Sequence, residues 1–250
     1  MNKILKRTLS ILASLLFIAG VALVLYQPVS VELGKLEAKS IIEEFDKTYN
    51  DVNNKNNKKN HNNKPQSSQA SVMNVDVNAL KNASIKYNKS LLDNQGTVNT
   101  SDYTKAALNL GKYGVTNGVF GYISAPAINM SLPIYLGANN SLMSIGAAHM
   151  CNTSLPVNMN DTNCCIAGHT GYRGRVFFDN LRQMSVGDEI KVKNYWQTVS
   201  YTVIDTKIIT DKQSEDFYIK KGKKLLTLMT CVSNNKGGFD RFLVICENKK

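Results

Sequence analysis

The longest apolar stretch of the chain lies close to its N-terminus. Residues 8–26 contain no charged side chain, and the cations Lys3, Lys6 and Arg7 precede them. At a rise of about 1.5 Å per residue, such a run nearly matches the roughly 30 Å hydrocarbon core of a bilayer. The pattern predicts a transmembrane helix over residues 8–26. By the positive-inside rule, residues 1–7 are then cytoplasmic and the remainder of the chain is extracellular.

A cleaved signal peptide is the alternative interpretation of this segment. The apolar run exceeds the usual length of a signal-peptide core, and Gln27-Pro28-Val29 follows it in place of a small-residue cleavage pattern. Both features favour a retained anchor. We therefore expect a single-pass protein of the cell membrane.

Between the anchor and residue 75 the pattern changes twice. Apolar positions recur among charged ones in residues 31–49, at Leu33, Leu36, Ile41, Ile42 and Phe45. This spacing predicts a short amphipathic helix at the membrane face. From residue 50 onward asparagine and lysine dominate, a composition that cannot bury enough apolar surface to order itself. We interpret residues 27–74 as a juxtamembrane helix and a flexible stalk; an insertion without a role is the alternative for the asparagine-rich part.

A helical pattern returns in residues 75–92 and opens a region, residues 75–117, that we expect to be helical or lid-like. Beyond it, residues 118–250 consist of short apolar segments separated by turn residues. These segments are 119–123, 128–134, 164–167, 189–192, 198–207, 225–230 and 242–246. Such a density of short strands predicts an all-β domain, either a sandwich or a barrel.

Cys231 lies at the C-terminal end of one of the predicted strands, residues 225–230. A polar, glycine-containing loop follows, and a returning strand carries Arg241 near its start. Strand, loop and strand bring the two side chains close together. A thiolate is the reactive form of cysteine, and a nearby cation lowers the pKa of the thiol, so this pair is a candidate nucleophile and its electrostatic partner.

Two histidines compete for the role of proton carrier. His169 follows the predicted strand 164–167 and opens a glycine-containing loop, which suits a proton shuttle at the rim of a cleft. His149 also precedes a loop. The sequence favours His169 as the shuttle and leaves His149 as a structural or substrate-groove residue.

Several separated motifs resemble the sortases, cysteine transpeptidases of the Gram-positive cell surface. They are Thr-Leu-Met-Thr-Cys at 227–231, the arginine-bearing strand Phe-Asp-Arg-Phe-Leu-Val-Ile-Cys-Glu at 239–247, and the segment 146–190 that contains His169. The resemblance covers residues 118–250. It implies a closed eight-stranded sortase-type β-barrel with a few short helices, one of them over residues 176–184.

The resemblance also implies a mechanism. Cys231 would attack an LPxTG-like sorting signal of a secreted protein, Arg241 would stabilise the oxyanion, and His169 would protonate the departing amine. Thr230 and His149 are the candidate substrate-binding residues. An amine, either a pilin lysine or a peptidoglycan cross-bridge, would then resolve the thioester. No metal or organic cofactor is expected.

Two regions resemble the pilus-building class C sortases more than the housekeeping type. One is residues 85–92, which are similar to the helix before the class C barrel, and the other is residues 137–156, which are similar to class C and D domains. No aspartate precedes any of the prolines, which argues against a lid built on an Asp-Pro-aromatic motif. The C-terminal membrane helix frequent in class C is also not found before Lys250. Pilin polymerisation is therefore favoured only slightly over wall anchoring.

The remaining cysteines are Cys151, Cys164, Cys165 and Cys246. With Cys231 they are compatible with two extracellular disulfides and one free thiol. Cys164 and Cys165 are adjacent, so at most one of them should face the core. A zinc site formed by His149, Cys151, Cys164, Cys165 and His169 is an alternative, but the spacing lacks a Cys-x-x-Cys pair.

Charge and motif content limit the other function classes. The net charge of +11 is concentrated in the stalk and the chain ends without an aromatic-basic motif, so an anionic cell envelope explains it better than nucleic acid does. An L,D-transpeptidase would carry its cysteine in a Ser-x-Gly-Cys type motif, which Met229-Thr230-Cys231 does not match. A catalytically silent surface or pilus protein would usually have lost one of the three candidate residues.

Overall fold

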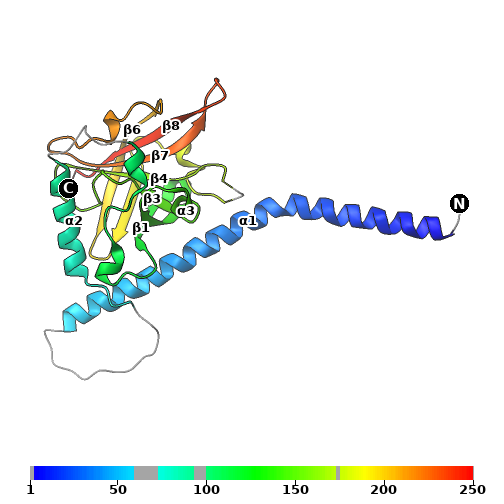
Figure 1. The fold of residues 1–250 in the computed structure, drawn as a ribbon, viewed down its shortest axis with the longest axis horizontal. Coiled ribbons are helices and arrows are strands. Elements are labelled where there is room, and N and C mark those ends of the chain that lie inside the picture. The colour runs from blue at the N-terminus through cyan, green and yellow to red at the C-terminus, as the bar shows by residue number, and fades with distance from the viewer. Residues whose placement is uncertain (1–2, 59–72, 93–99, 173–174, 250) are drawn as a thin grey trace.

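The computed structural model describes residues 3–58, 73–92, 100–172 and 175–249. Its centre is a closed barrel with the strand order β1-β2-β3-β4-β7-β8-β6-β5 (Figure 1). The strands are β1 (Val119–Ala125), β2 (Met130–Leu136), β3 (Ala147–His149), β4 (Thr162–Ala167), β5 (Glu189–Asn194), β6 (Thr198–Ile209), β7 (Lys224–Ser233) and β8 (Phe239–Glu247). The neighbours β2 and β3, and likewise β4 and β7, are parallel. The predicted fold class is therefore confirmed.

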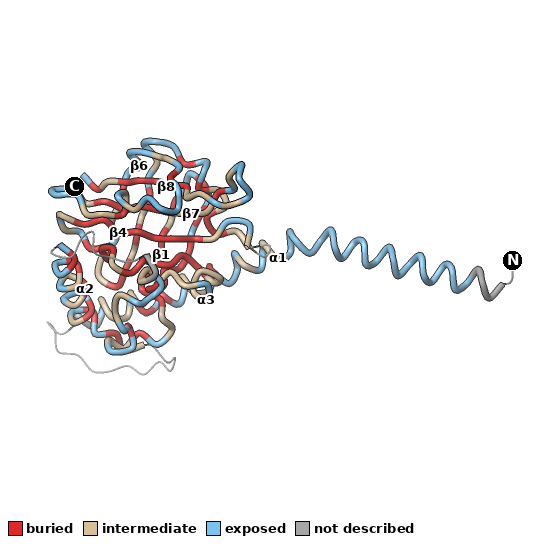
Figure 2. The backbone as a smooth tube through the Cα atoms, turned by 45° about the horizontal axis from the view of Figure 1, so that its top comes forward, coloured by how far each residue is buried: buried red, intermediate tan, exposed pale blue. Residues whose placement is uncertain are grey.

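The helices lie outside the barrel or between its strands. They are α1 (Lys3–Lys58), α2 (Val77–Leu91) and α3 (Asn140–Met143), with the 3₁₀ turns η1 (Thr100–Thr104), η2 (Leu110–Tyr113), η3 (Pro126–Ile128), η4 (Leu181–Gln183) and η5 (Glu215–Phe217). The burial pattern separates two regions of the chain clearly. Figure 2 shows the barrel strands largely buried, and residues 7–29 of α1 are exposed.

Alternate side chains of each strand fill the barrel interior. Along β7, Leu226, Leu228 and Val232 belong to the interior cluster, whereas Met229 packs with a separate cluster on the outer face. Because successive side chains of a strand point to opposite faces, Cys231 lies on the same outer face as Met229.

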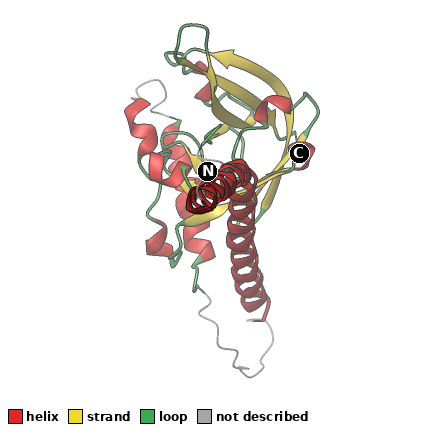
Figure 3. Ribbon diagram, turned by 90° about the vertical axis from the view of Figure 1, so that its right-hand side faces the viewer, coloured by secondary structure: helices red, strands yellow, loops and turns green. Residues whose placement is uncertain are grey.

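The first half of α1 is the candidate membrane span. It is long and apolar enough to cross a bilayer by length and composition, and its most apolar window is not buried at all. The helix contains Pro28, which cannot complete the backbone hydrogen-bond ladder. Figures 1 and 3 show that α1 bends between its free N-terminal half and the half that lies along the barrel.

The second half of α1 is anchored to the barrel by an aromatic contact. Phe45 is completely buried, and its ring centroid lies 5.7 Å from that of Tyr122 and 4.6 Å from that of Tyr195. Beside it, Lys193 Nζ lies 2.7 Å from Asp46 Oδ1. Of the apolar positions predicted for an amphipathic helix, Ile41 and Phe45 therefore face the barrel, while Leu33 and Leu36 remain exposed.

The boundary predicted between the juxtamembrane helix and the stalk does not appear in the structure. Residues 50–58 continue α1, and Val52 still packs against the cluster that contains Phe45. The remainder of the asparagine-rich segment, residues 59–72, lies outside the described residues. Since α1 already contacts the barrel at Phe45, the barrel is connected to the candidate span through a helix.

The predicted helix over residues 75–92 is confirmed as α2. Asp76 caps it by accepting a hydrogen bond from Ala79 N. Asn88 Nδ2 donates to Leu155 O at 3.0 Å and Asn88 Oδ1 accepts from Leu155 N at 2.8 Å, while Tyr87 Oη accepts from Asn152 N. The Tyr-Asn pair of α2 thus fixes the loop that follows β3.

The helix expected over residues 176–184 was wrong in extent, since only η4 forms. Asp179 Oδ1 accepts from Gly171 N and Asp179 Oδ2 accepts from Phe177 N. The N–H of Phe178 donates to His169 O at 2.9 Å. These bonds hold Phe177 and Phe178 to Asp179 and to the loop that carries His169, and regular helical hydrogen bonding is limited to η4.

Replacing Phe45 with alanine tests the docking of α1. Phe45→Ala should lower the free energy of unfolding by about 3 to 5 kcal/mol, because a fully buried ring is removed and a cavity remains. Urea unfolding followed by fluorescence of Trp196, the only tryptophan in the chain, measures this change. Leu33→Ala on the exposed part of the same helix is the control. A loss below about 1 kcal/mol for Phe45→Ala would contradict the docking.

Candidate active site

Cys231 and Arg241 face each other across two antiparallel strands. They are direct register partners in the β7–β8 pair. Arg241 Nη1 lies 3.6 Å from Cys231 Sγ and also donates to the carbonyl oxygens of Phe239 and Asp240, at 3.4 and 3.5 Å. The guanidinium cannot lose its proton in a protein, so a permanent positive charge stands beside the thiol.

The turn between β7 and β8 fixes this register. Asn234 Oδ1 accepts from Lys236 N at 3.0 Å and from Gly238 N at 2.9 Å, and Asn234 Nδ2 donates to Asp240 Oδ1 at 3.2 Å. Gly237 has a φ of 75°, which glycine adopts without strain. The polar loop predicted from sequence is therefore an ordered turn held by one asparagine.

His169 is brought to the same place by the parallel pairing of β4 with β7. The pairing extends to Ala167 opposite Met229, and Gly168 N then donates to Met229 O at 3.1 Å. The buried hydroxyl of Thr230 donates to Gly168 O at 2.8 Å. These bonds hold the backbone preceding His169 against the residues preceding Cys231. The structure therefore brings the three candidate residues to one end of β4, β7 and β8.

The imidazole ring of His169 stacks on an aromatic ring that sequence reasoning missed. Its centroid lies 4.5 Å from that of Tyr172, with an angle of 10° between the ring planes. His169 Nε2 is buried and has no hydrogen-bond partner in the part of the chain that the structure describes. Burial lowers the pKa of His169 from its ordinary value of 6.5. A tyrosine three residues after a loop histidine was the only available sequence signal.

Close packing holds the loop that carries His169. A Cβ atom on Gly168 would lie 2.7 Å from the ring of Phe178, so only glycine fits there. Phe178 itself is completely buried in the barrel core. The loop therefore has one end fixed by β7 and the other by the core.

His149 occupies a different environment from His169. Its side chain is completely buried, and Nε2 lies 3.0 Å from Ser154 O and 3.2 Å from Thr153 O. Because carbonyl oxygens only accept, Nε2 carries the proton. Burial lowers the pKa of His149 to about 4. Of the two roles left open by the sequence, this environment favours the structural one.

Cys231 is also distinguished from the other cysteines by its exposure. All five thiols are free, so the two disulfides compatible with the sequence are not formed. Cys231 is partly exposed, whereas Cys151, Cys164, Cys165 and Cys246 are buried. Burial raises the thiol pKa of Cys164, Cys165 and Cys246, which keeps them in the unreactive protonated form.

The adjacent residues Cys164 and Cys165 show that both faces of β4 are buried. Cys164 belongs to the interior cluster, and Cys165 belongs to the outer-face cluster with Phe217. The two side chains do point to opposite faces, as predicted, but the loop between β6 and β7 covers the outer one. In the described ranges of the chain, no three His, Cys, Asp or Glu side chains form a group that could hold a metal ion.

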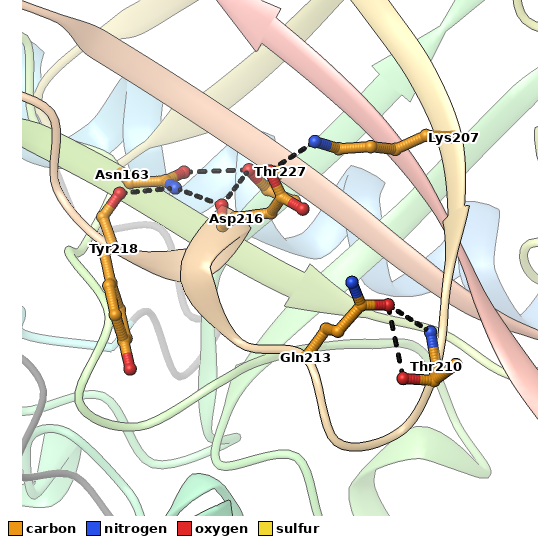
Figure 4. Close-up of polar contacts among 7 residues, drawn as sticks. All are labelled: Asn163, Lys207, Thr210, Gln213, Asp216, Tyr218 and Thr227. Atoms are coloured by element: carbon orange, nitrogen blue, oxygen red, sulfur yellow. Dashed lines mark hydrogen bonds and ion pairs between the residues drawn. The ribbon is translucent and has the colours of Figure 1, made fainter.

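A polar network attaches the covering loop to β4 and β7 (Figure 4). The buried Asn163 Nδ2 donates to Asp216 O at 2.8 Å and to Tyr218 O at 3.1 Å, and its Oδ1 accepts from Thr227 Oγ1 at 3.0 Å. Lys207 also forms an ion pair with the Asp216 carboxylate. The loop therefore forms a fixed wall on the outer face of the barrel.

This wall borders an apolar strip that leads along the outer face toward Cys231. Phe217 packs there with Tyr103 of η1, whose ring centroid lies 6.2 Å away, and Met229 contacts the same cluster. Tyr103 O accepts hydrogen bonds from Ala138 N at 2.9 Å and from Cys151 N at 3.2 Å. Sequence reasoning expected a lid-like region over residues 75–117 but did not identify Tyr103.

Comparison with known proteins agrees with this arrangement. A sortase domain family model matches residues 123–249. Sortase A of Streptococcus agalactiae serotype III (strain NEM316) is 27% identical over 136 residues, which are 53% of this chain and 53% of that protein. The chain thus spans about half the length of the curated relatives it matches.

Solved structures extend the similarity beyond the barrel. The complex of Streptococcus agalactiae sortase C1 and MTSET is 26% identical with a TM-score of 0.61, over 69% of this chain and 88% of that chain. The pilus-related sortase C of Group B Streptococcus is 26% identical with a TM-score of 0.59, over 70% and 92% of the two chains. Since the family model covers half of the sequence, this chain belongs to the sortase family.

The buried state of His149 predicts a specific acid sensitivity. Its pKa is about 4 in the folded chain against an ordinary value of 6.5, so the unfolded chain binds the proton more readily. Stability should therefore fall as the pH drops from about 6.5 toward 4, by up to roughly 3 kcal/mol from this residue. Urea unfolding of His149→Gln should show a smaller difference between neutral and acidic pH than the unchanged protein. His169→Gln is the matched control, and an equal reduction in both variants would refute the assignment.

Proposed function

We propose that this protein is a cysteine transpeptidase that cleaves an LPxTG-like sorting signal and transfers its acyl part to an amine. The observation that carries the proposal is the Arg241 Nη1–Cys231 Sγ contact of 3.6 Å. A fixed cation beside a partly exposed thiol is positioned to bind an oxyanion that forms there. The sortase family match supports the same activity.

In the first half of the proposed reaction, Cys231 Sγ attacks the carbonyl carbon of the threonine in the signal. Electrons move to the carbonyl oxygen, and the Arg241 guanidinium stabilises the resulting negative charge. Collapse of this intermediate breaks the C–N bond, and His169 gives its proton to the departing amine. A thioester between Cys231 and the signal remains.

In the second half, an incoming primary amine attacks the thioester carbon and passes a proton to His169. The Cys231 thiolate leaves, and a new amide or isopeptide bond forms. The likeness to a pilus-related sortase C favours a pilin lysine as this amine over a peptidoglycan cross-bridge. The exchange conserves the number of amide bonds and needs no redox partner.

The substrate peptide is proposed to approach Cys231 along the outer face of β7, where Met229 is partly exposed. Met229 packs against the buried outer-face cluster that contains Phe217, so this surface is fixed from beneath. Thr230 and His149 were the candidate substrate-binding residues, but only 3% and 0% of their surfaces are exposed. We therefore assign them to holding the surrounding backbone, with Thr230 acting through Gly168 O.

The proposed location follows from the candidate span in α1. Cations precede this span, so residues 1–7 would remain cytoplasmic and the barrel would stand outside the cell. Sorting-signal proteins and their acceptor amines are then accessible on the same side as Cys231.

Intact mass spectrometry tests the covalent step directly. The protein incubated with an LPxTG-type peptide should gain the mass of the peptide's acyl part, and hydroxylamine should remove it because a thioester is cleaved by that nucleophile. Cys231→Ala should show no adduct, whereas Cys246→Ala, which removes a buried thiol, should keep it. An adduct that survives in Cys231→Ala would show that the nucleophile is misassigned.

The stacking of His169 on Tyr172 predicts a second kinetic effect. Tyr172→Ala should slow acyl-enzyme formation by roughly 2- to 10-fold, because an aromatic pair contributes about 0.5 to 1.5 kcal/mol to holding the imidazole ring. Tyr172→Phe retains the ring and should remain near the unchanged rate. Single-turnover mass spectrometry measures the rates, and equal rates in all three proteins would exclude a positioning role for Tyr172.

A further inference from the structure

Helix α1 and the end of the barrel enclose a pocket that the proposed reaction does not use. Its volume is about 430 Å³, within the range of ligand sites in proteins. Gly34, Ala38 and Ile42 of α1 form one wall, and Met130 and Leu132 of β2 contribute to the opposite one. Glycine and alanine carry no side chain beyond Cβ, so the helix leaves space there.

The apolar surface of α1 continues from the candidate span to the level of this pocket. The exposed large apolar side chains of the helix extend from Leu9 to Leu36. Gly34 lies eight residues, about 12 Å along the helix, beyond Tyr26 at the end of the predicted span. The two headgroup layers add roughly 10–15 Å to the hydrocarbon core, so one layer is about 5–8 Å thick and the pocket wall at Gly34 begins just outside it.

Charged side chains surround the apolar walls of the pocket. Lys35, Glu37, Lys39, Glu43 and Arg175 all line it; Arg175 Nη1 lies 2.9 Å from Glu37 Oε2, and Lys39 Nζ lies 3.9 Å from Glu43 Oε1. A rim that carries both signs matches a zwitterionic headgroup, because the cations can bind the phosphate while the stems of their side chains cover apolar surface. The combination of an apolar interior and a charged rim fits an amphiphile.

We propose that this pocket binds one acyl chain of a membrane phospholipid, with the headgroup at the rim formed by Lys35, Lys39 and Arg175. Three observations agree on this ligand: the position of the pocket beside the candidate span, its apolar walls and its charged rim. No other segment of the described chain has to move to admit the acyl chain, because the space is already open.

The bound lipid would also contact the loop that carries His169. Phe177 and Asn180 line the pocket, and the adjacent Phe178 N donates to His169 O at 2.9 Å. Occupancy would therefore restrain this loop and favour the catalytic position of the imidazole. This consequence rests on the proposed transpeptidase function, whereas lipid binding does not.

Photochemical crosslinking tests the binding. The full chain is placed in phosphatidylcholine–phosphatidylglycerol nanodiscs that contain a phosphatidylcholine with a diazirine near the end of one acyl chain. After irradiation, mass spectrometry should find adducts on residues 128–132 or 176–180, in addition to the candidate span. Ala38→Trp fills the pocket and should reduce the barrel adducts about tenfold while leaving the span adducts unchanged.

Two further variants separate pocket filling from misfolding. Gly34→Leu places a side chain in the same pocket from a helical position. It should reduce the barrel adducts as Ala38→Trp does. Ser40→Trp adds the same bulk on the exposed side of α1 and should change nothing. Adducts confined to the span, or barrel adducts that persist in both pocket variants, would overturn the proposal.

The effect on the His169 loop is measured separately. The rate of acyl-enzyme formation in nanodiscs should fall in Ala38→Trp and not in Ser40→Trp. If Ala38→Trp loses the barrel adducts but forms the acyl-enzyme at the unchanged rate, the lipid site is supported and its coupling to the His169 loop is rejected. If the unchanged protein forms no acyl-enzyme at all, the transpeptidase proposal fails, and the crosslinking result still decides the lipid site.

Discussion

The register of β7 between β4 and β8 determines where the candidate catalytic side chains lie. Side chains alternate along a strand, so a slip of one residue would turn Cys231 into the barrel interior and Val232 out of it. The same slip would move Arg241 away from its partner position and break the bond between Thr230 and Gly168 O. The interior residues Leu226 and Leu228 resist this slip, because it would turn both of them out of the core. Core packing and site geometry are thus set by one alignment.

Most of this alignment could be predicted from local sequence. The strand and turn pattern around Cys231 placed Arg241 opposite it, because a hairpin is formed by residues that are close in the chain. His169 was found by its position after a buried strand. Tyr172 was not predicted, because its stacking on His169 depends on the path of the loop between them and Asp179. Hydrogen bonds to Asp179 set this path, and they leave no periodic pattern in the sequence. The strand β3 was missed because three residues are too few for an alternating pattern to emerge.

The errors concern contacts that no repeating sequence pattern shows. The resemblance to the sortases implied a helix over residues 176–184, but regular helical hydrogen bonding there is limited to η4. The asparagine-rich composition suggested a stalk beginning at residue 50, yet residues 50–58 continue a helix already anchored by Phe45. Phe45 packs its buried ring against Tyr122, which lies more than seventy residues further along the chain. Local helix propensity is a weak predictor of where α1 ends when such a distant contact stabilises the helix.

The two histidines show how burial assigns roles to identical side chains. His149 ends β3, and His169 follows the neighbouring strand β4. The side chain of His149 is completely buried against backbone carbonyl oxygens, whereas that of His169 is partly exposed at the end of the barrel. Complete burial keeps the imidazole of His149 neutral over the physiological range, so it cannot exchange protons with a substrate. Partial exposure lets His169 reach solvent while Tyr172 limits its rotation. Arg175, six residues after His169, forms an ion pair with Glu37 of α1, so the segment that follows the candidate proton carrier is linked to the helix that contains the candidate span.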